Sequence, residues 1–250
     1  MLFSIITVTR NNLEGLQKTH RSLIPQTCRD FEWIIIDGAS TDGTADYLKN
    51  LPEGWVSEPD NGIYDAMNKG ITRAQGDYLL FLNAGDQLAT VHTLARIREA
   101  LKSRKPALIY GDALEERPGE SPALKPARPH KKAAWGLFTH HQAMLYNRAA
   151  IGERRYDLSY KIAADYDFTL RVLKASAGDA LYVSLPVCLF EAGGLSQQRT
   201  RLARSEQFTI RKATLGLNPV LNSAITGKQI AAQLLKDNAP AFYWRLRTRC

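Results

Sequence analysis

The sequence has few cysteines and no long apolar run. Cys28, Cys188 and Cys250 are far apart and show neither metal-ligand spacing nor a disulfide framework, a pattern typical of a reducing cytosol. No stretch approaches the roughly 20 apolar residues that a membrane-spanning helix needs. The segment 1–8 lacks a basic start and a cleavage site, so it predicts a first strand and not a signal peptide. We therefore expect a cytoplasmic protein.

Several common ligand-binding motifs are also missing. No Gly-x-Gly-x-x-Gly follows the first apolar run, where Thr9-Arg10-Asn11-Asn12 stands instead, and this argues against a dinucleotide-dependent oxidoreductase. The sequence has no Walker A motif, no nucleophile elbow and no paired cysteine motif. Its chemistry must therefore come from another set of residues.

Acidic residues are scarce at the C-terminal end of the chain. Residues 199–250 contain ten Lys or Arg and two acidic residues, whereas residues 1–198 contain 23 of each. The net charge of +8 therefore lies in this last segment. A basic segment on a neutral body indicates an anionic surface as partner, although a solvated basic helix without a partner would show the same composition.

Apolar runs and helical patterns alternate along the first part of the chain. The patterns predict strands at 3–8, 31–36, 55–57 and 78–82 and helices at 12–24, 44–51 and 63–74. Strand–helix–strand units at this spacing predict a parallel sheet. Further on they predict helices at 90–103 and 165–177, strands at 107–110 and within 135–146, two short strands within 181–190, and a long loop at 115–132. The length predicts one domain, 1–215, followed by a basic helical tail, 216–250.

The stretch 77–86 ends an apolar strand in Asn-Ala-Gly-Asp. Its five apolar or aromatic residues, 78–82, suit a strand buried on both faces. Asp86 then lies beyond the carboxyl end of that strand, where open α/β sheets bind ligands. Asp37 follows the strand at 31–36 in the same way, and Asp165 opens a helix. Each carboxylate alone would fit a turn or a helix cap, but their joint placement predicts a shared cleft.

Four blocks of sequence stand in a characteristic order: SIITV at 4–8, IDGASTDGT at 36–44, EPDNGIYDAMNKG at 58–70 and FLNAGD at 81–86. Together they resemble the family 2 glycosyltransferases, and the last two are most similar to the bacterial branch that builds exopolysaccharide and O-antigen units, including the colanic-acid enzymes. Ala164-Asp165-Tyr166-Asp167 continues the resemblance, which fades in the tail. The resemblance implies the GT-A fold, a Rossmann-like three-layer α/β/α arrangement with a mostly parallel central sheet.

The resemblance implies a nucleotide-sugar donor, usually a UDP-sugar, with GDP and dTDP donors as alternatives. Thr7, Thr9 and Asp37 would hold the base and ribose, with Asp37 accepting a hydrogen bond from the uracil ring. Asp60 and Asp65 lie in the block that closes over the donor. The other donor-binding residues implied by the matching motifs are Val8, Asn11, Asn68, Asn83 and Ala84.

The resemblance also implies a divalent cation, Mg²⁺ or Mn²⁺. Asp86 matches the last acidic position of the family's metal-binding motif, and a hard cation with oxygen ligands suits a carboxylate plus two phosphates. This chain departs from the pattern, because many relatives carry acids at the positions of Asn83 and Gly85. A single protein carboxylate would leave the metal held mainly by the diphosphate, so we expect weak metal binding without the donor.

Asp165 matches the catalytic base of the family. In an inverting transfer this base takes the proton of the acceptor hydroxyl, and Asp167 is the nearest alternative for the role. The resemblance places His141, Gln142 and Asp112 near the acceptor or the diphosphate, although a structural histidine would explain His141 equally well. The processive signature Gln-x-x-Arg-Trp is absent, so we expect one sugar to be added to each acceptor.

The tail acquires a rationale from the same resemblance. Its apolar positions, which include Ile230, Leu234, Phe242 and Tyr243, alternate with basic residues, as in an amphipathic helix that lies on an anionic leaflet. This placement would bring the enzyme to an undecaprenyl-diphosphate-linked glycan acceptor at the cytoplasmic face of the inner membrane. A helix packed on the domain, or on a second subunit of a homodimer, is the alternative.

Three other functions stay open on the residues alone. A sugar nucleotidyltransferase also pairs a parallel sheet with metal-binding carboxylates, but it normally has a Gly-rich basic loop after its first strand. A nucleic-acid-binding module would use Phe242-Tyr243-Trp244-Arg245 for stacking, yet this leaves the carboxylate cleft unexplained, so we expect no nucleic-acid partner. A protein that binds a sugar nucleotide without catalysis is disfavoured by Asp165.

Overall fold

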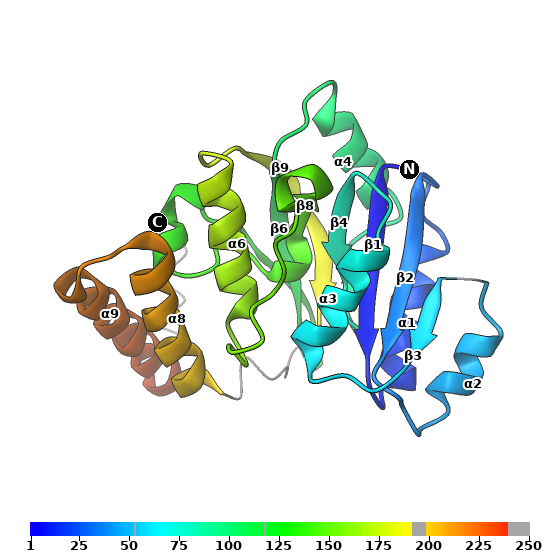
Figure 1. Cartoon of the computed structure of the whole chain (residues 1–250), viewed down its shortest axis with the longest axis horizontal. Helices are drawn as coiled ribbons and strands as arrows, with labels where there is room; N and C mark the ends of the chain where they lie inside the picture. The colour runs from blue at the N-terminus through cyan, green and yellow to red at the C-terminus, as the bar shows by residue number, and fades with distance from the viewer. Residues whose placement is uncertain (53, 118, 192–198, 240–250) are drawn as a thin grey trace.

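A computed structural model describes residues 1–52, 54–117, 119–191 and 199–239. One mixed sheet has the strand order β3-β2-β1-β4-β8-β6-β9-β5, and β7 pairs with β6 outside this path (Figure 1). The strands are β1 (Phe3–Thr9), β2 (Phe31–Asp37), β3 (Trp55–Ser57), β4 (Tyr78–Phe81), β5 (Gln87–Leu88), β6 (Leu108–Arg117), β7 (Glu120–Lys125), β8 (Met144–Asn147) and β9 (Ala180–Phe190).

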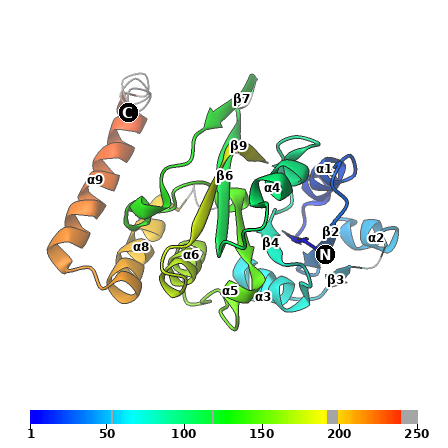
Figure 2. The ribbon, with the colours of Figure 1, turned by 90° about the horizontal axis from the view of Figure 1, so that it is seen from above.

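Helices cover both faces of the sheet. Helices α1 (Leu13–Leu23) and α4 (Thr93–Leu101) pack on one face, and α3 (Ile63–Arg73) and α6 (Ala164–Ala175) pack on the other (Figure 2). The remaining helices are α2 (Thr44–Lys49), α5 (Arg148–Ile151), α8 (Thr200–Leu215), α9 (Pro219–Asn238) and the 3₁₀ turns η1 (His130–Trp135) and η2 (His141–Ala143). The predicted three-layer α/β/α fold is confirmed.

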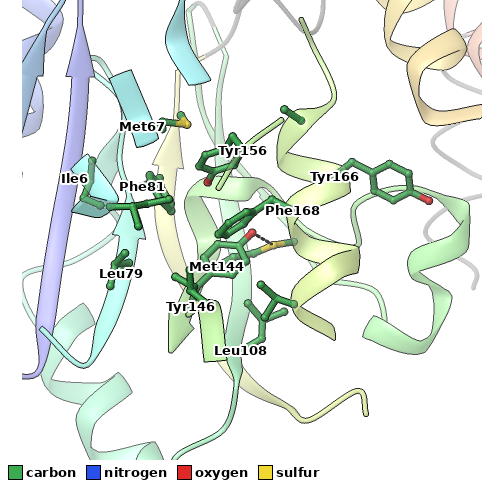
Figure 3. Packing of buried hydrophobic residues seen from close by; sticks show 14 of the residues in the cluster. Ile6, Met67, Leu79, Phe81, Leu108, Met144, Tyr146, Tyr156, Tyr166 and Phe168 are labelled. Carbon is green, nitrogen blue, oxygen red and sulfur yellow. Dashed lines mark hydrogen bonds between the residues drawn. The ribbon is translucent and has the colours of Figure 1, made fainter. Parts of the chain in front are cut away.

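Strand β4 is the centre of the core, as its apolar run predicts. Alternate residues enter the two clusters on opposite faces of the sheet, with Leu79 and Phe81 on the α3 and α6 side and Leu80 on the α4 side. All three side chains are fully buried, and each such burial contributes about 2 kcal/mol to stability. Figure 3 shows Phe81 beside Tyr156, and Tyr156 in turn stacks on Phe168 of α6.

The strand order changes direction beside β1. Strands β2 and β4 both pair with β1 in parallel, on opposite sides, and β3 extends the sheet beyond β2. The loops after β1 and β4 therefore leave in different directions, and a crevice forms at the carboxyl ends of these strands. Thr9 is paired in register with Asp37, so the two strand ends predicted to carry the site do lie together.

Two predictions for the middle of the chain are wrong. The segment 115–132 is not one loop, because β6 continues to Arg117 and pairs with β7, where Lys125 forms an ion pair of 2.7 Å with Glu115. Its prolines obscure this hairpin in the sequence, and Pro122 is tolerated because β7 lies outside the main path of the sheet. The two short strands expected in 181–190 are one strand, β9, with a register shift beside Pro186.

The helical region at the end of the described chain packs on the domain. Arg211 of α8 is fully buried and donates from Nε to Oδ1 of Asn222 in α9 at 2.6 Å. On α9, Ile225 is buried, whereas Ile230 and Leu234 are exposed. The predicted apolar and aromatic positions in 240–250 lie outside the described residues. None of the described helices is long and apolar enough to cross a membrane.

Candidate active site

A cavity of about 1060 Å³ opens at the carboxyl ends of β1 and β4 and runs past the start of α6 to η1, α8 and α9. Its volume is at the upper end of the range for ligand pockets. Nine of the predicted site residues line it, namely Val8, Thr9, Asp60, Asn83, Ala84, Asp86, His141, Gln142 and Asp165. The structure thus brings together the carboxylates that follow β4 and open α6.

Asp86 lies where the loop after β4 meets the end of β9. Its Oδ2 accepts a hydrogen bond from Nε2 of Gln142 at 2.9 Å, and its Oδ1 accepts one from the backbone N–H of Glu191 at 3.1 Å. Burial raises the pKa of Asp86 to about 7, and the neighbouring Glu191 carboxylate acts in the same direction. A cation bound here would stabilise the ionised form of Asp86.

Asp165 stands in the first turn of α6, at the wall of the same cavity. Its Oδ1 accepts a hydrogen bond from the backbone N–H of Tyr166 at 2.8 Å, and the hydroxyl of Tyr64 lies 3.4 Å away. Burial raises the pKa of Asp165 to about 6. A carboxylate with this pKa is ionised at neutral pH and is a better proton acceptor than an ordinary aspartate.

The loop that leads into α6 is held by a carboxylate from α8. Glu206, which is 9% exposed, accepts hydrogen bonds from the backbone N–H groups of Lys161, Ile162 and Ala163 at 2.8, 2.9 and 2.8 Å. Hydrogen bonds to an ionised acceptor are the stronger kind. Helix α8 therefore fixes the position from which Asp165 enters the cavity.

Asp167, the alternative base, is occupied by other contacts. Its Oδ2 pairs with Nε of Arg171 at 2.6 Å, and its Oδ1 accepts from the hydroxyl of Thr214 at 2.9 Å. It is almost fully buried and does not line the cavity. Asp167 therefore ties α6 to α8, and its contacts favour Asp165 as the proton acceptor.

Two residues predicted to contact the base and ribose do not line the cavity. Asp37 is fully buried, and its carboxylate accepts from the hydroxyl of Ser57 at 2.6 Å and from the backbone N–H and hydroxyl of Ser40. Thr7 is also fully buried, and its hydroxyl accepts from the indole Nε1 of Trp33 at 2.9 Å. Asp37 organises the loops beside the crevice, and Thr7 belongs to the layer below it.

Of the other residues predicted to bind the donor, some line the cavity and some hold neighbouring segments of the backbone in place. Asp60 lines the cavity, whereas Asp65 accepts from the backbone N–H of Asn61 at the start of α3. Asn68 bonds to both backbone groups of Tyr156, at 3.0 and 2.8 Å, and so fixes that segment. Asn11 does not line the cavity either, because its side chain accepts from the backbone of the loop after β2.

His141 and Gln142 differ in their surroundings from Asp112. His141 is buried, lies 2.8 Å from the hydroxyl of Tyr156 and stacks on Phe81, and burial lowers its pKa to about 3. It is therefore neutral at physiological pH. Asp112 lies outside the cavity lining, where it accepts from the hydroxyl of Tyr182 and from a backbone N–H.

Several lining residues were not predicted from the sequence. Glu191 follows β9 as Asp86 follows β4, so the same rule applied to the strand at 181–190 would have found it. Trp135 and the amides of Gln207 and Gln229 line the far end of the cavity, with Nε2 of Gln229 donating to Oε1 of Gln207 at 2.9 Å. These residues come from η1, α8 and α9, and no local pattern brings them together.

The oxygen atoms at the crevice suit a hard cation. Asp86 and Glu191 present carboxylates, and the side-chain oxygens of Thr9 and Asn83 are buried without a hydrogen-bond partner in the part of the chain that the structure describes. Oxygen donors of this kind fit Mg²⁺ or Mn²⁺. In the described part of the chain, no group of three or more His, Cys, Asp or Glu side chains is placed to hold a metal. A cation here would therefore need further ligands, such as phosphate oxygens.

Residues 4–161 match the family model described as glycosyl transferase family 2. A PGL/p-HBAD biosynthesis glycosyltransferase from Mycobacterium bovis is 35% identical over 215 residues, which cover 78% of this chain and 79% of that protein. A putative teichuronic acid biosynthesis glycosyltransferase from Bacillus subtilis, TuaG, is 35% identical over 92 residues, covering 34% of this chain and 36% of the relative.

Solved structures share the fold. S. aureus TarS 1–349 in complex with UDP superposes with a TM-score of 0.66 at 17% identity, covering 96% of this chain and 73% of that one. Glucosyl-3-phosphoglycerate synthase from Mycobacterium tuberculosis, in complex with Mn²⁺ and UDP-glucose, gives a TM-score of 0.62 at 14% identity, covering 87% and 80% of the two chains.

Proposed function

Because the chain belongs to glycosyl transferase family 2, and is therefore a glycosyltransferase that uses nucleotide-sugar donors, we propose a specific reaction for it. The enzyme transfers one sugar from a UDP-sugar, with inversion and with the help of Mg²⁺ or Mn²⁺, to a lipid-linked oligosaccharide in bacterial surface polysaccharide synthesis. The relatives named for PGL/p-HBAD and teichuronic acid biosynthesis support an acceptor of this class.

The observation that carries the proposal is that Asp165 and Asp86 line one cavity at the switch point of the sheet. The donor diphosphate would lie at the crevice beside Asp86, and the acceptor hydroxyl beside Asp165. Asp165 takes the proton of that hydroxyl while the acceptor oxygen bonds to the anomeric carbon and the bond from that carbon to the diphosphate breaks. Attack from the face opposite the diphosphate inverts the anomeric centre.

Asp86, with the neighbouring oxygens of Thr9 and Asn83, would hold the cation on the donor side. A bound divalent cation offsets the negative charge that develops on the departing diphosphate. Residues of the protein would supply the rest of the rate acceleration. Glu206 fixes the loop before Asp165, and binding of both substrates in the one cavity that Asp86 and Asp165 line would hold them in line, which lowers the entropic part of the barrier.

The far end of the cavity supports a glycan as acceptor. Trp135 is 37% exposed there, with Nζ of Lys228 4.9 Å from its ring centroid. Side-chain amides donate and accept hydrogen bonds at the same time, so the glutamines of α8 and α9 match the hydroxyl groups of a sugar. The exposed Ile230 and Leu234 on α9 support contact with the membrane that carries the lipid.

Calorimetry with UDP, GDP and dTDP, with and without Mn²⁺, tests the donor. We expect metal-dependent binding of UDP by the wild-type protein and by Asp165→Asn. Transfer from a UDP-sugar to a polyprenyl-diphosphate glycan should fall at least about a hundredfold in Asp165→Asn, because the proton acceptor is lost. The configuration of the product, read by NMR, tests inversion.

Asp167→Asn is the matched control, because it removes a carboxylate from the same helical turn outside the cavity. We expect it to lower stability and leave the chemical step in place. Tight binding of GDP or dTDP would show that the donor carries that nucleotide in place of UDP, and the proposed glycosyltransferase activity would stand. If no nucleotide bound to the wild-type protein, the proposed function would be wrong.

A further inference from the structure

The loop after β4 cannot readily carry an acid at position 85. Gly85 has a φ of +106°, a conformation that side-chain-bearing residues rarely adopt. A Cβ built on Gly85 would clash with Oε2 of Glu191 and would lie 2.9 Å from its carboxyl carbon. The Glu191 carboxylate therefore occupies the space that a side chain at position 85 would need.

Glu191 is held in this place by the sheet. It directly follows β9, and β9 pairs with β5 just after the Asp86 turn, with Gln87 opposite Leu189. The backbone N–H of Glu191 donates to Oδ1 of Asp86 at 3.1 Å. Strand pairing and this hydrogen bond together bring a carboxylate from 105 residues away to the side of Asp86.

Two buried side-chain oxygens at the carboxyl ends of β1 and β4 indicate a ligand. Thr9 is 7% exposed and lines the cavity, and its Oγ1 has no hydrogen-bond partner among the described residues. Within the same part of the chain, the buried Oδ1 of Asn83, on the loop that carries Asp86, also has none. Unpaired buried polar atoms are costly, and oxygens of this kind are the ligands that a hard divalent cation or its hydration water would use.

We propose that Glu191 supplies the second carboxylate of the divalent-cation site, in place of the acid that the loop after β4 lacks. The inference rests on the proposed function, since it concerns the cation that accompanies the donor diphosphate. The proposal also gives Lys18 a role in metal binding. Its Nζ lies 3.0 Å from Oε1 of Glu191, so its ammonium group neutralises Glu191 in the metal-free protein and competes with the cation for this carboxylate.

The two partners should therefore have opposite effects on metal binding. Glu191→Gln removes a ligand, and we expect Mn²⁺ affinity in the presence of UDP to fall at least about tenfold, in line with the effects of disturbing residues around a metal. Lys18→Gln removes the competitor, and we expect Mn²⁺ to bind severalfold more tightly. A purely structural ion pair would make both variants weaker.

The measurement is a titration of free Mn²⁺ by electron paramagnetic resonance at saturating UDP, with calorimetry of UDP binding beside it. Glu14→Gln is the matched control, because Glu14 also pairs with Lys18, at 3.7 Å, and is 82% exposed. It should leave the Mn²⁺ affinity unchanged. Since the Lys18–Glu191 pair is partly exposed, its loss costs little stability, and thermal unfolding checks that the variants fold.

The outcomes separate this inference from the proposed function. Wild-type binding of Mn²⁺ and UDP that is retained in Glu191→Gln would overturn the role of Glu191 and leave the enzyme as proposed. Weaker binding in both Glu191→Gln and Lys18→Gln would also overturn it. If the wild-type protein bound no nucleotide under any condition, both would be wrong.

Discussion

Replacing Asp86 by Asn should stabilise the metal-free protein at neutral and higher pH. Asp86 is 4% exposed, and burial raises its pKa from an ordinary 3.8 to about 7. Below the lower value the group is protonated in both the folded and the unfolded chain. Between the two values only the unfolded chain releases the proton, so the stability of the wild-type protein falls as the pH rises.

The size of the effect follows from the two pKa values. They differ by about 3 pH units, and each unit corresponds to about 1.4 kcal/mol, which gives an upper limit of about 4 kcal/mol above pH 7. Asn is uncharged at every pH and avoids this cost. The side-chain oxygen of the introduced Asn can still accept a hydrogen bond from the backbone N–H of Glu191. Its side-chain N–H can donate to the amide oxygen of Gln142 if the Gln142 amide flips by 180°.

The assay is urea unfolding of the wild type and Asp86→Asn in the presence of a chelator, from about pH 4 to about pH 8. The two free energies of unfolding should be similar at the lower limit and diverge as the pH rises. Glu14→Gln, at an exposed position, should follow the wild type throughout. Parallel curves for wild type and Asp86→Asn, or a less stable variant at pH 8, would contradict the pKa assigned to Asp86.

Three further predictions concern catalysis. The transfer rate should fall below about pH 6, because Asp165 must be ionised to accept the proton and burial raises its pKa to about 6; a pH–rate profile without this limb would exclude Asp165 as the base. Glu206→Gln should cost about 2 kcal/mol of stability, since hydrogen bonds to an ionised acceptor are lost, and should lower kcat more than UDP affinity, as urea unfolding and calorimetry can measure. Trp135→Ala should raise the KM for the acceptor and leave UDP binding unchanged; an equal loss of both would place Trp135 outside the acceptor site.

The sequence predicted the elements whose signals are local. The apolar runs located β1, β2 and β4, and Asn12 caps α1 by accepting from the backbone N–H of Gly15. The positions of Asp86 and Asp165 in the site were predictable because Asp86 follows an apolar strand and Asp165 opens a helix, and both elements have clear local patterns. The rule that ligands meet at the carboxyl ends of parallel strands then placed Asp86 at a cleft.

The residues that sequence reasoning missed depend on long-range pairing. Glu206 is one of two acids in a basic segment, but only the packing of α8 on α6 brings it to three backbone N–H groups. Asp37 illustrates the opposite case. Its position after β2 predicts a contact with the donor, and in the structure Ser40, three residues along, and Ser57, 20 residues along, donate to its carboxylate. The contact with Ser57 depends on the pairing of β3 with β2, which no local pattern reveals.

Burial raises the pKa of two of the carboxylates that line the cavity, Asp86 and Asp165, with different consequences for function. The pKa is about 7 for Asp86 and about 6 for Asp165, so each carboxylate ionises at a higher pH than an ordinary aspartate. In the proposed donor complex, a cation bound beside Asp86 would favour the ionised form of Asp86. Asp165 is proposed to accept a proton, and its raised pKa makes it a better proton acceptor than an ordinary aspartate. Cation binding would therefore lower the pKa of Asp86, whereas the raised pKa of Asp165 suits its proposed role as the base.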